Sequence, residues 1–282
     1  MTMNLILQGM DGDGARLQRI AALAAPARVV KLGDRALRCE GVDGSARLRQ
    51  DIEAAALAER VDASFIEGEL RLGDFKLLAM DMDSTVITIE CIDEIADMQG
   101  LKPQVAAITE AAMRGELDFS ASLTQRVALL EGLDASALQR VYDERLRLSP
   151  GFETLLAAVK AAGLKTLLVS GGFTFFTGRL KERFGLDYAH ANVLEIVDGK
   201  LTGRVLGGIV DAEEKKRTVQ RVCLDLGIAP AQAIVIGDGA NDLMMMGIAG
   251  LSVAFRAKPV VRAQADIALN FVGLDGVLAL FD

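Results

Sequence analysis

Two aspartates and two hydroxyl residues follow a single apolar run, with a spacing that could support phosphoryl-transfer chemistry. The run Leu77–Met80 leads into four polar positions, Asp81, Asp83, Ser84 and Thr85. Such a run is typical of a buried parallel strand, and open α/β sheets bind ligands at the carboxyl ends of their strands. Two close carboxylates repel one another unless a cation or a shared proton is present. The pair therefore favours Mg²⁺, beside which a carboxylate can attack phosphorus, over the alternative of a solvated turn.

Two further segments offer groups that could hold a phosphate. The strand expected over 164–169 is followed by a hydroxyl residue and two glycines, Ser170, Gly171 and Gly172. Because the glycines have no side chains, their backbone N–H groups can approach an oxyanion closely. Lys215 and Lys216 begin the helix expected over 213–226, where a cation opposes the helix dipole. One of the two lysines is therefore a candidate for neutralising phosphate; the alternatives are a plain turn and a solvated lysine pair.

A second acidic strand end completes the set. The strand expected over 233–236 leads into an acidic segment with flanking glycines, Gly237, Asp238, Gly239, Asn241 and Asp242. Asp238 would stand at its strand tip as Asp81 does, and the glycines would let the backbone pack against a ligand. Asn241 and Asp242 would begin the next helix and orient their neighbours by hydrogen bonds. The alternative for this segment is a tight turn followed by a helix cap.

Taken in this order, the acidic, hydroxyl-glycine, lysine and acidic segments resemble the haloacid-dehalogenase-like phosphohydrolase superfamily, and within it the phosphoserine phosphatase family. The resemblance covers roughly residues 74–282 and is closest in two stretches, 81–94 and 237–242. It implies that Asp81 is the nucleophile and forms an aspartyl-phosphate, while Asp83 acts first as general acid and then as general base. It also implies Mg²⁺ as cofactor, held by the Asp81 carboxylate, the Asp83 backbone carbonyl and the Asp238 carboxylate.

The same resemblance implies which residues bind the substrate, O-phospho-L-serine, whose hydrolysis is the last step of serine biosynthesis. The groups that would hold the phosphoryl group or support the metal site belong to Ser170, Gly171, Gly172, Lys215, Asn241 and Asp242. Glu90 would bind the substrate ammonium and Arg126 its carboxylate, because a guanidinium binds a carboxylate through two parallel hydrogen bonds. Met113 and Phe119 would shield the substrate with apolar surface. The alternatives are cap core for Met113 and Phe119, and a surface helix position for Arg126.

Other functions fit the same motifs. The aspartyl-phosphate could pass to an alcohol such as homoserine instead of water, or the substrate could be another small phosphate ester. An inert phosphatase fold attached to an amino-acid sensor is a further alternative. The intact set of acidic and phosphate-binding positions argues against that last interpretation.

The order of expected elements indicates two domains. Residues 1–72 follow the order βαββαβ, a ferredoxin-like pattern that amino-acid-sensing ACT domains share, and this domain could bind serine or form a homodimer. Residues 73–282 alternate strands and helices as a doubly wound parallel sheet does, with a four-helix cap inserted over about 90–148. The expected helices include 12–25, 45–59, 174–184, 213–226 and 241–248. The expected strands include 3–8, 28–32, 36–39, 61–65, 76–82, 187–192, 193–197, 200–206, 251–254 and 267–269.

Composition and charge exclude several classes of protein. The 282 residues carry a formal net charge of −8, which argues against a large nucleic-acid interface, so local positive groups must attract any anionic ligand. No apolar run reaches the roughly 18 residues of a membrane span, and the N-terminus lacks the basic start of a signal peptide. Cys39, Cys91 and Cys223 form no C-x-x-C motif and His190 is the only histidine, so neither a zinc site nor a disulfide framework is expected. A reducing cytoplasm and a small-molecule partner fit this pattern.

Overall fold

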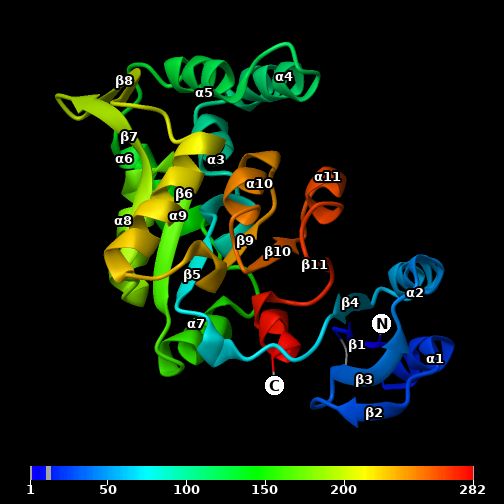
Figure 1. Cartoon of the computed structure of the whole chain (residues 1–282). Coiled ribbons are helices and arrows are strands. Elements are labelled where there is room, and N and C mark those ends of the chain that lie inside the picture. Colours follow the sequence, from blue (N-terminus) through cyan, green and yellow to red (C-terminus); the bar gives the residue numbers. More distant parts are fainter. Residues whose placement is uncertain (1, 11–13, 282) are drawn as a thin grey trace.

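The chain forms two sheets, and helices cover both faces of the larger one (Figure 1). The structure is a computed structural model that describes residues 2–10 and 14–281. Within these residues the small sheet has 4 strands in the order β2-β3-β1-β4, and the large sheet has 7 strands in the order β11-β10-β9-β5-β6-β7-β8. This architecture confirms the predicted fold class, a ferredoxin-like unit followed by a doubly wound α/β core. None of the described helices combines the length and the apolar character that a membrane crossing requires.

The N-terminal unit is an antiparallel sheet with two helices packed against it. Its elements are β1 (Thr2–Gln8), α1 (Gly14–Ala24), β2 (Arg28–Lys31), β3 (Ala36–Asp43), α2 (Ala46–Ala58) and β4 (Asp62–Ile66). The core between sheet and helices includes Leu5, Leu7, Leu17, Ile20 and Ile52. Ser45 caps α2, because its hydroxyl accepts a hydrogen bond from the Leu48 N–H at 3.4 Å. Residues 12 and 13 of the first expected helix lie outside the described residues.

In the large sheet, the pairings of β5, β6, β7, β9, β10 and β11 are parallel, and the edge strand β8 pairs antiparallel with β7. Its strands are β5 (Leu77–Met80), β6 (Lys165–Phe173), β7 (Tyr188–Val197), β8 (Lys200–Leu206), β9 (Ala233–Gly237), β10 (Leu251–Phe255) and β11 (Ile267–Leu269). The helices around it are α7 (Phe152–Ala161), α8 (Thr174–Phe184), α9 (Ala212–Leu226), α10 (Leu243–Met246) and α11 (Pro259–Arg262). Leu78 and Met80 of β5 share a core with α7 and α8. Leu77 and Ala79 point to the opposite face and share a core with α9 and α10.

Several boundaries differ from the sequence-based expectations. Helix α7 is not predicted, although its buried positions Phe152, Leu155, Leu156 and Val159 recur at helical spacing. Strand β7 is continuous where two strands are predicted, because it first extends the parallel sheet and then forms the hairpin with β8. Strand β5 ends at Met80, since the chain turns after Asp81 into a π-helical turn, Met82–Val86, in which Ser84 has φ 57°.

The insertion forms a helical cap above the carboxyl edge of the large sheet, at the top of Figure 1. Its helices are α3 (Cys91–Asp97), α4 (Lys102–Met113), α5 (Phe119–Ala128) and α6 (Ser136–Arg140), followed by a π-helical turn, Val141–Arg145. Ile87 and Leu148 form an isolated antiparallel bridge, so the chain leaves the core and returns to it at one place. The side chains of Leu123, Val127 and Leu130 anchor α5 in the hydrophobic core.

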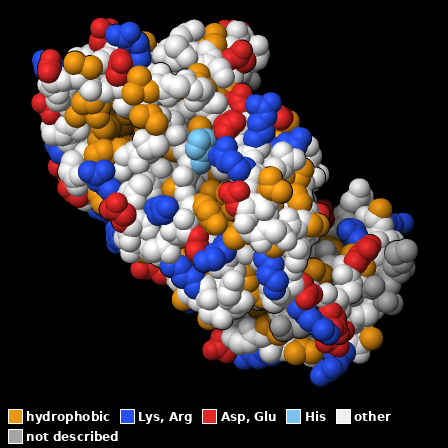
Figure 2. Space-filling view, turned by 60° about the vertical axis from the view of Figure 1, so that its left-hand side comes forward, with side chains coloured by type: hydrophobic (Ala, Val, Ile, Leu, Met, Phe, Trp, Pro, Cys, Tyr) orange, Lys and Arg blue, Asp and Glu red, His pale blue; other side chains and the backbone are white. Residues whose placement is uncertain are grey.

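The surface carries both signs of charge and exposes some hydrophobic side chains. On the face in Figure 2, acidic and basic side chains are interspersed, and hydrophobic side chains gather at the end away from the N-terminal unit. The β7–β8 hairpin at that end exposes Val193, Ile196, Val197 and Leu206. All three cysteines are buried and free, as the absence of a disulfide pattern predicts.

A buried carboxylate connects the N-terminal unit to the large sheet. Asp62, at the start of β4, is 1% exposed. Its Oδ1 accepts hydrogen bonds from the N–H of Asn270 at 2.7 Å and from the amide side chain of that residue at 3.2 Å. Its Oδ2 accepts from the N–H groups of Phe271 at 2.9 Å and Val272 at 3.0 Å. Three successive backbone donors after β11 are thus satisfied by one side chain from the other sheet.

We predict that Asp62→Ala lowers the free energy of unfolding by on the order of 3 kcal/mol, because these N–H groups lose a charged acceptor in a region with little water. Urea denaturation measures the change, and amide exchange at 270–272 locates it. Asp51→Ala, at an exposed position of α2, is the matched control and should change little. Equal stability of the two variants would contradict this role for Asp62.

Candidate active site

Parallel pairing of β5 and β9 brings the two predicted acidic strand ends together. Met80 is in register with Ile236, and the Asp81 N–H donates to the Ile236 carbonyl at 3.0 Å. One carboxylate oxygen from each of Asp81, Asp238 and Asp242 lies within 4.8 Å of the others. The sequence-predicted pair of strand tips is therefore a real cluster at the carboxyl edge of the sheet.

Lys215 lies inside this cluster. Its side chain is 0% exposed, and its Nζ donates to Asp81 Oδ1 at 2.8 Å and to Asp242 Oδ1 at 2.7 Å. Burial alone would lower the pKa of Lys215, but the two carboxylates outweigh burial and raise it, so the ammonium stays charged. Lys216, one position along α9, forms no ion pair within the described part of the chain. Burial thus distinguishes Lys215 from Lys216, which the sequence spacing alone cannot do.

Asp242 positions the loop after β9. While its Oδ1 accepts from Lys215, its Oδ2 accepts from the backbone N–H groups of Asp238 at 3.1 Å and Gly239 at 3.0 Å. Both oxygens of this fully buried carboxylate are therefore engaged. The Thr85 hydroxyl donates to Asp238 Oδ1 at 3.2 Å and orients that carboxylate. Asn241 lies beside Gly239 in the same loop, where a methyl group added to Gly239 would meet its amide oxygen.

The carboxylates destabilise one another's charged forms. Burial and then the charge of Asp242 raise the pKa of Asp81 well above its usual range, although Lys215 opposes the shift. Burial, Asp242 and Glu90 raise the pKa of Asp238 to about 7. A divalent cation would remove this repulsion, and carboxylate oxygens are the ligands that hard cations prefer. The donor set therefore fits a metal ion held by Asp81 and Asp238.

Asp83 stands between the sheet and the cap. Its Oδ1 accepts a hydrogen bond from the N–H of Cys91, the first residue of α3, at 3.1 Å. Burial and the nearby charge of Glu90 raise the pKa of Asp83 to about 7. A carboxyl group with such a pKa can donate a proton and accept one back near neutral pH.

The hydroxyl-glycine segment at the end of β6 lies against these aspartates. Ser170 is 1% exposed, and its Oγ accepts from the Gly172 N–H at 2.8 Å. A Cβ added to Gly172 would collide with the Asp83 carboxylate, so a larger residue there would have to displace that carboxylate. A Cβ added to Gly171 would lie 2.8 Å from Cζ of Phe119, which places this cap residue directly over the segment.

Asn192 is a buried polar residue that the sequence analysis does not select. Its Nδ2 donates to the Gly171 carbonyl at 2.7 Å, and its Oδ1 accepts from the Val210 N–H at 2.8 Å. It thereby links the hydroxyl-glycine segment to the loop that leads into α9 and Lys215. Asn192 is the supporting residue that motif spacing misses, because it has no local signature, whereas Thr85 belongs to the hydroxyl pair noted after Asp83.

Comparison with known proteins identifies the family. A family model described as haloacid dehalogenase-like hydrolase matches residues 78–247. The chain belongs to the haloacid dehalogenase-like hydrolase family. A phosphoserine phosphatase from Polaromonas sp. is 59% identical to this hydrolase over 217 residues, 75% of this chain and 92% of that protein.

Solved structures agree with this assignment. A probable phosphoserine phosphatase from Vibrio cholerae, unliganded, matches with a TM-score of 0.83 and 39% identity over 99% of this chain and 85% of that one. A structure described as a phospho-aspartyl intermediate analogue of phosphoserine phosphatase matches with a TM-score of 0.69 and 38% identity over 74% of this chain and 99% of that one. The similarity to the first of these structures extends over the N-terminal unit.

The cap of the hydrolase contributes polar groups above the aspartates. The Ser84 hydroxyl donates to Glu90 Oε1 at 2.8 Å, and burial is the main cause that raises the pKa of Glu90. Arg126 Nε is buried and has no hydrogen-bond partner among the described residues. Burial lowers the pKa of Arg126, which the carboxylates of Asp93 and Glu90 oppose. Met113 ends α4, and its side chain lies outside what the structure describes.

We predict that a divalent cation raises the melting temperature of the hydrolase and that Asp238→Asn removes most of this shift. Binding at 100 times the dissociation constant adds about 2.7 kcal/mol to stability. Differential scanning calorimetry with and without chelator measures it. Asp198→Asn, an exposed control at φ 50° where asparagine is tolerated, should keep the shift. An equal shift in both variants would place the cation elsewhere.

Proposed function

We propose that this hydrolase is a Mg²⁺-dependent phosphoserine phosphatase that converts O-phospho-L-serine to L-serine and phosphate, the last step of serine biosynthesis. The observation that carries the proposal is the buried Asp81 carboxylate, which Lys215 holds through one oxygen at the tip of a central strand. The similarity to phosphoserine phosphatases over most of the chain supports the same activity. A small phosphate ester is therefore the proposed substrate class, and serine its alcohol.

In the proposed mechanism, Asp81 attacks phosphorus in line with the departing serine oxygen and becomes an aspartyl-phosphate. Asp83 gives its proton to that oxygen; it then removes a proton from the water that cleaves the acyl-phosphate, which releases phosphate and restores Asp81. Asp81, the Asp83 backbone carbonyl and Asp238 would hold Mg²⁺, which would supply positive charge to offset that on the phosphoryl oxygens. The hydroxyl of Ser170 and the ammonium of Lys215 contribute donors to the same oxygens.

Two cap residues are proposed to recognise the amino-acid part of the substrate. The Arg126 guanidinium has an unused buried donor, and a substrate carboxylate would satisfy it through paired hydrogen bonds. Glu90 would bind the ammonium group. Phe119 covers Gly171 and would keep water away until the aspartyl-phosphate has formed. The proximity of all three groups to the aspartates supports this assignment.

The same proposal includes the domain division and the cellular location. We assign residues 1–72 to an ACT-like domain and 73–282 to the catalytic domain, with a cap over about 90–148. The predicted boundary falls in a short 3₁₀ turn, Leu72–Asp74, between β4 and β5. Three buried, unpaired cysteines are compatible with a reducing cytoplasm.

We predict that the protein releases phosphate from L-phosphoserine faster than from sugar phosphates, nucleotides or phosphohomoserine. Asp81→Asn should lower kcat by a factor on the order of 10⁴ or more, because the nucleophile is lost. Steady-state phosphate release measures both, with Asp198→Asn as the control that retains activity. Preference for another ester would overturn the substrate assignment, and full activity of Asp81→Asn would overturn the mechanism.

We predict that Arg126→Met raises KM for L-phosphoserine about tenfold or more with a smaller change in kcat, because a charged hydrogen bond to the substrate carboxylate is lost. O-phosphoethanolamine lacks that carboxylate, so its kcat/KM should be nearly the same in variant and parent. Arg114→Met is the matched cap control, since Arg114 is exposed and pairs with the exposed Glu116 at 2.6 Å. A parallel loss with both substrates would indicate that Arg126 only maintains cap structure.

A further inference from the structure

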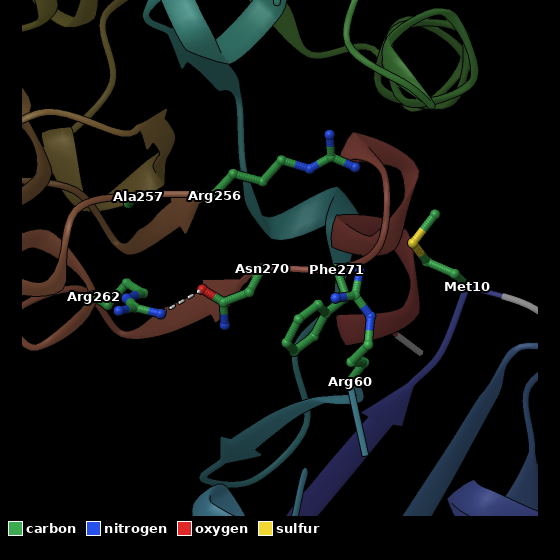
Figure 3. Close-up of a pocket in the computed structure, with 7 residues that line it drawn as sticks. All are labelled: Met10, Arg60, Arg256, Ala257, Arg262, Asn270 and Phe271. Atoms are coloured by element: carbon green, nitrogen blue, oxygen red, sulfur yellow. Dashed lines mark hydrogen bonds between the residues drawn. The ribbon is translucent and has the colours of Figure 1, made fainter. Parts of the chain in front are cut away.

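A hollow of about 500 Å³ lies between the N-terminal domain and the large sheet, apart from the aspartate cluster (Figure 3). Its lining residues are Met10, Arg60, Arg256, Ala257, Arg262, Asn270 and Phe271. Met10 and Arg60 come from the N-terminal domain, and the others come from the β10–α11 segment and the loop after β11. The hollow is within the size range of small-molecule sites.

Arginine side chains bring positive charge to this hollow. Three of the seven lining residues are arginines and none is acidic. Arg60 lies over the Phe271 ring at 5.2 Å, and Arg262 donates to the side-chain oxygen of Asn270 at 3.3 Å (Figure 3). Arg256 donates to the Val272 carbonyl at 3.4 Å. Within the described part of the chain, none of the three pairs with a carboxylate, although the protein as a whole has a net charge of −8.

The backbone at two of these arginines is held in an unusual conformation. Arg60 has φ 56° and Arg256 has φ 46°, in the left-handed region that residues with side chains seldom adopt. Hydrogen bonds maintain it, from the Arg60 N–H to the Leu57 carbonyl at 3.2 Å and from the Arg256 N–H to the Leu269 carbonyl at 2.7 Å. Such conformations are found most often at ligand clamps and switches. Here both help to bring an arginine to the hollow.

We propose that this hollow binds a small, doubly charged oxyanion through Arg60 and Arg256, with Arg262 adding positive charge to the lining. Guanidinium groups bind phosphate-type and carboxylate oxygens through paired, charge-assisted hydrogen bonds. The anion would offset the positive charge of this lining, which no carboxylate of the described residues pairs with. A phosphate-type group and a dicarboxylate share this chemistry, and both are tested below.

The hollow is also connected to the aspartate cluster. Arg256 and Arg262 flank Lys258, whose N–H donates to the carbonyl of Asp238 at 3.1 Å. On the other side, Asp62 holds the loop that carries Asn270 and Phe271. An anion that joins Arg60 to Arg256 would therefore restrain segment 256–262 next to the proposed metal ligand. The anion would in this way regulate turnover; this second part rests on the proposed function, whereas binding does not.

The binding test uses the full chain at low ionic strength without metal, with sulfate and succinate as dianions and acetate at equal ionic strength as the monoanion control. Hydrogen exchange of the amides in 256–262 and 270–272 is followed during each titration. We expect sulfate or succinate to slow the exchange of these amides. The dianion that protects them at the lower concentration identifies the ligand type, which is phosphate-like for sulfate and a dicarboxylate for succinate. Arg60→Gln should raise the half-saturating concentration about tenfold, whereas Arg204→Gln, exposed on β8, should not.

Sulfate that binds only at the active site would protect these amides equally in the parent and in Arg60→Gln, and that result would overturn the proposal. Equal protection by acetate would also overturn it. Because Arg60→Gln could fold poorly, Arg60→Lys serves as a second variant that keeps the charge but loses the paired geometry, with an expected intermediate affinity.

The regulatory part is tested by kcat at saturating L-phosphoserine with Mg²⁺, where competition at the active site is suppressed. We expect the protecting dianion to change kcat several-fold in the parent and in Arg204→Gln, but not in Arg60→Gln. If the dianion protects these amides but does not change kcat, the binding site stands and its regulatory role is overturned. Absence of phosphoserine turnover would refute the proposed function, while the exchange data would still decide whether the anion binds.

Discussion

Repulsion among buried carboxylates is the constraint on which the catalytic end of this molecule depends. Asp81, Asp238 and Asp242 meet at the edge of the sheet, where burial prevents water from screening their charges. Lys215 supplies one compensating charge and binds two of them, and breaking a buried pair of this kind costs about 3–5 kcal/mol. Burial first, and then the remaining repulsion, raise the pKa values of Asp81 and Asp238. The binding of a divalent cation at this point would relieve the repulsion and favour the charged carboxylates.

The fold satisfies this constraint because separate segments of the chain position the charged side chains. Parallel pairing fixes β5 beside β9, which brings Asp81 to the loop of Asp238 and Asp242. Helix α9 crosses one face of the sheet and delivers Lys215 to both of these strand ends. The cap is connected to the same place through the hydrogen bond from the Cys91 N–H to Asp83. The Asp62 carboxylate follows a related principle at the domain interface, where backbone donors rather than a cation compensate its burial.

Sequence patterns predict those features that depend on local spacing. Alternation of strands and helices indicates the fold, and acidic residues directly after apolar runs indicate both strand tips, because parallel strands share a carboxyl edge. Lys215 and Lys216 cannot be distinguished in this way, since only the packing of α9 against the sheet decides which one is buried. The role of Asn192 cannot be predicted from the sequence, because a single polar residue within a strand forms no motif and its hydrogen-bond partners are 21 and 18 residues away. The arginine-lined hollow cannot be predicted either, because Arg60 and Arg256 line one hollow only when the N-terminal unit packs against the large sheet.

The most direct test of the account is to trap the covalent intermediate at Asp81. The enzyme would be mixed with L-phosphoserine and Mg²⁺, quenched in acid within one turnover, and reduced with borohydride, which converts a phosphorylated aspartate to homoserine. Mass spectrometry of the peptide that contains Asp81 then reads the outcome. The account predicts homoserine at Asp81 only when phosphoserine is present. Modification of a different carboxylate, or continued turnover with unmodified Asp81 at every quench time, would contradict it.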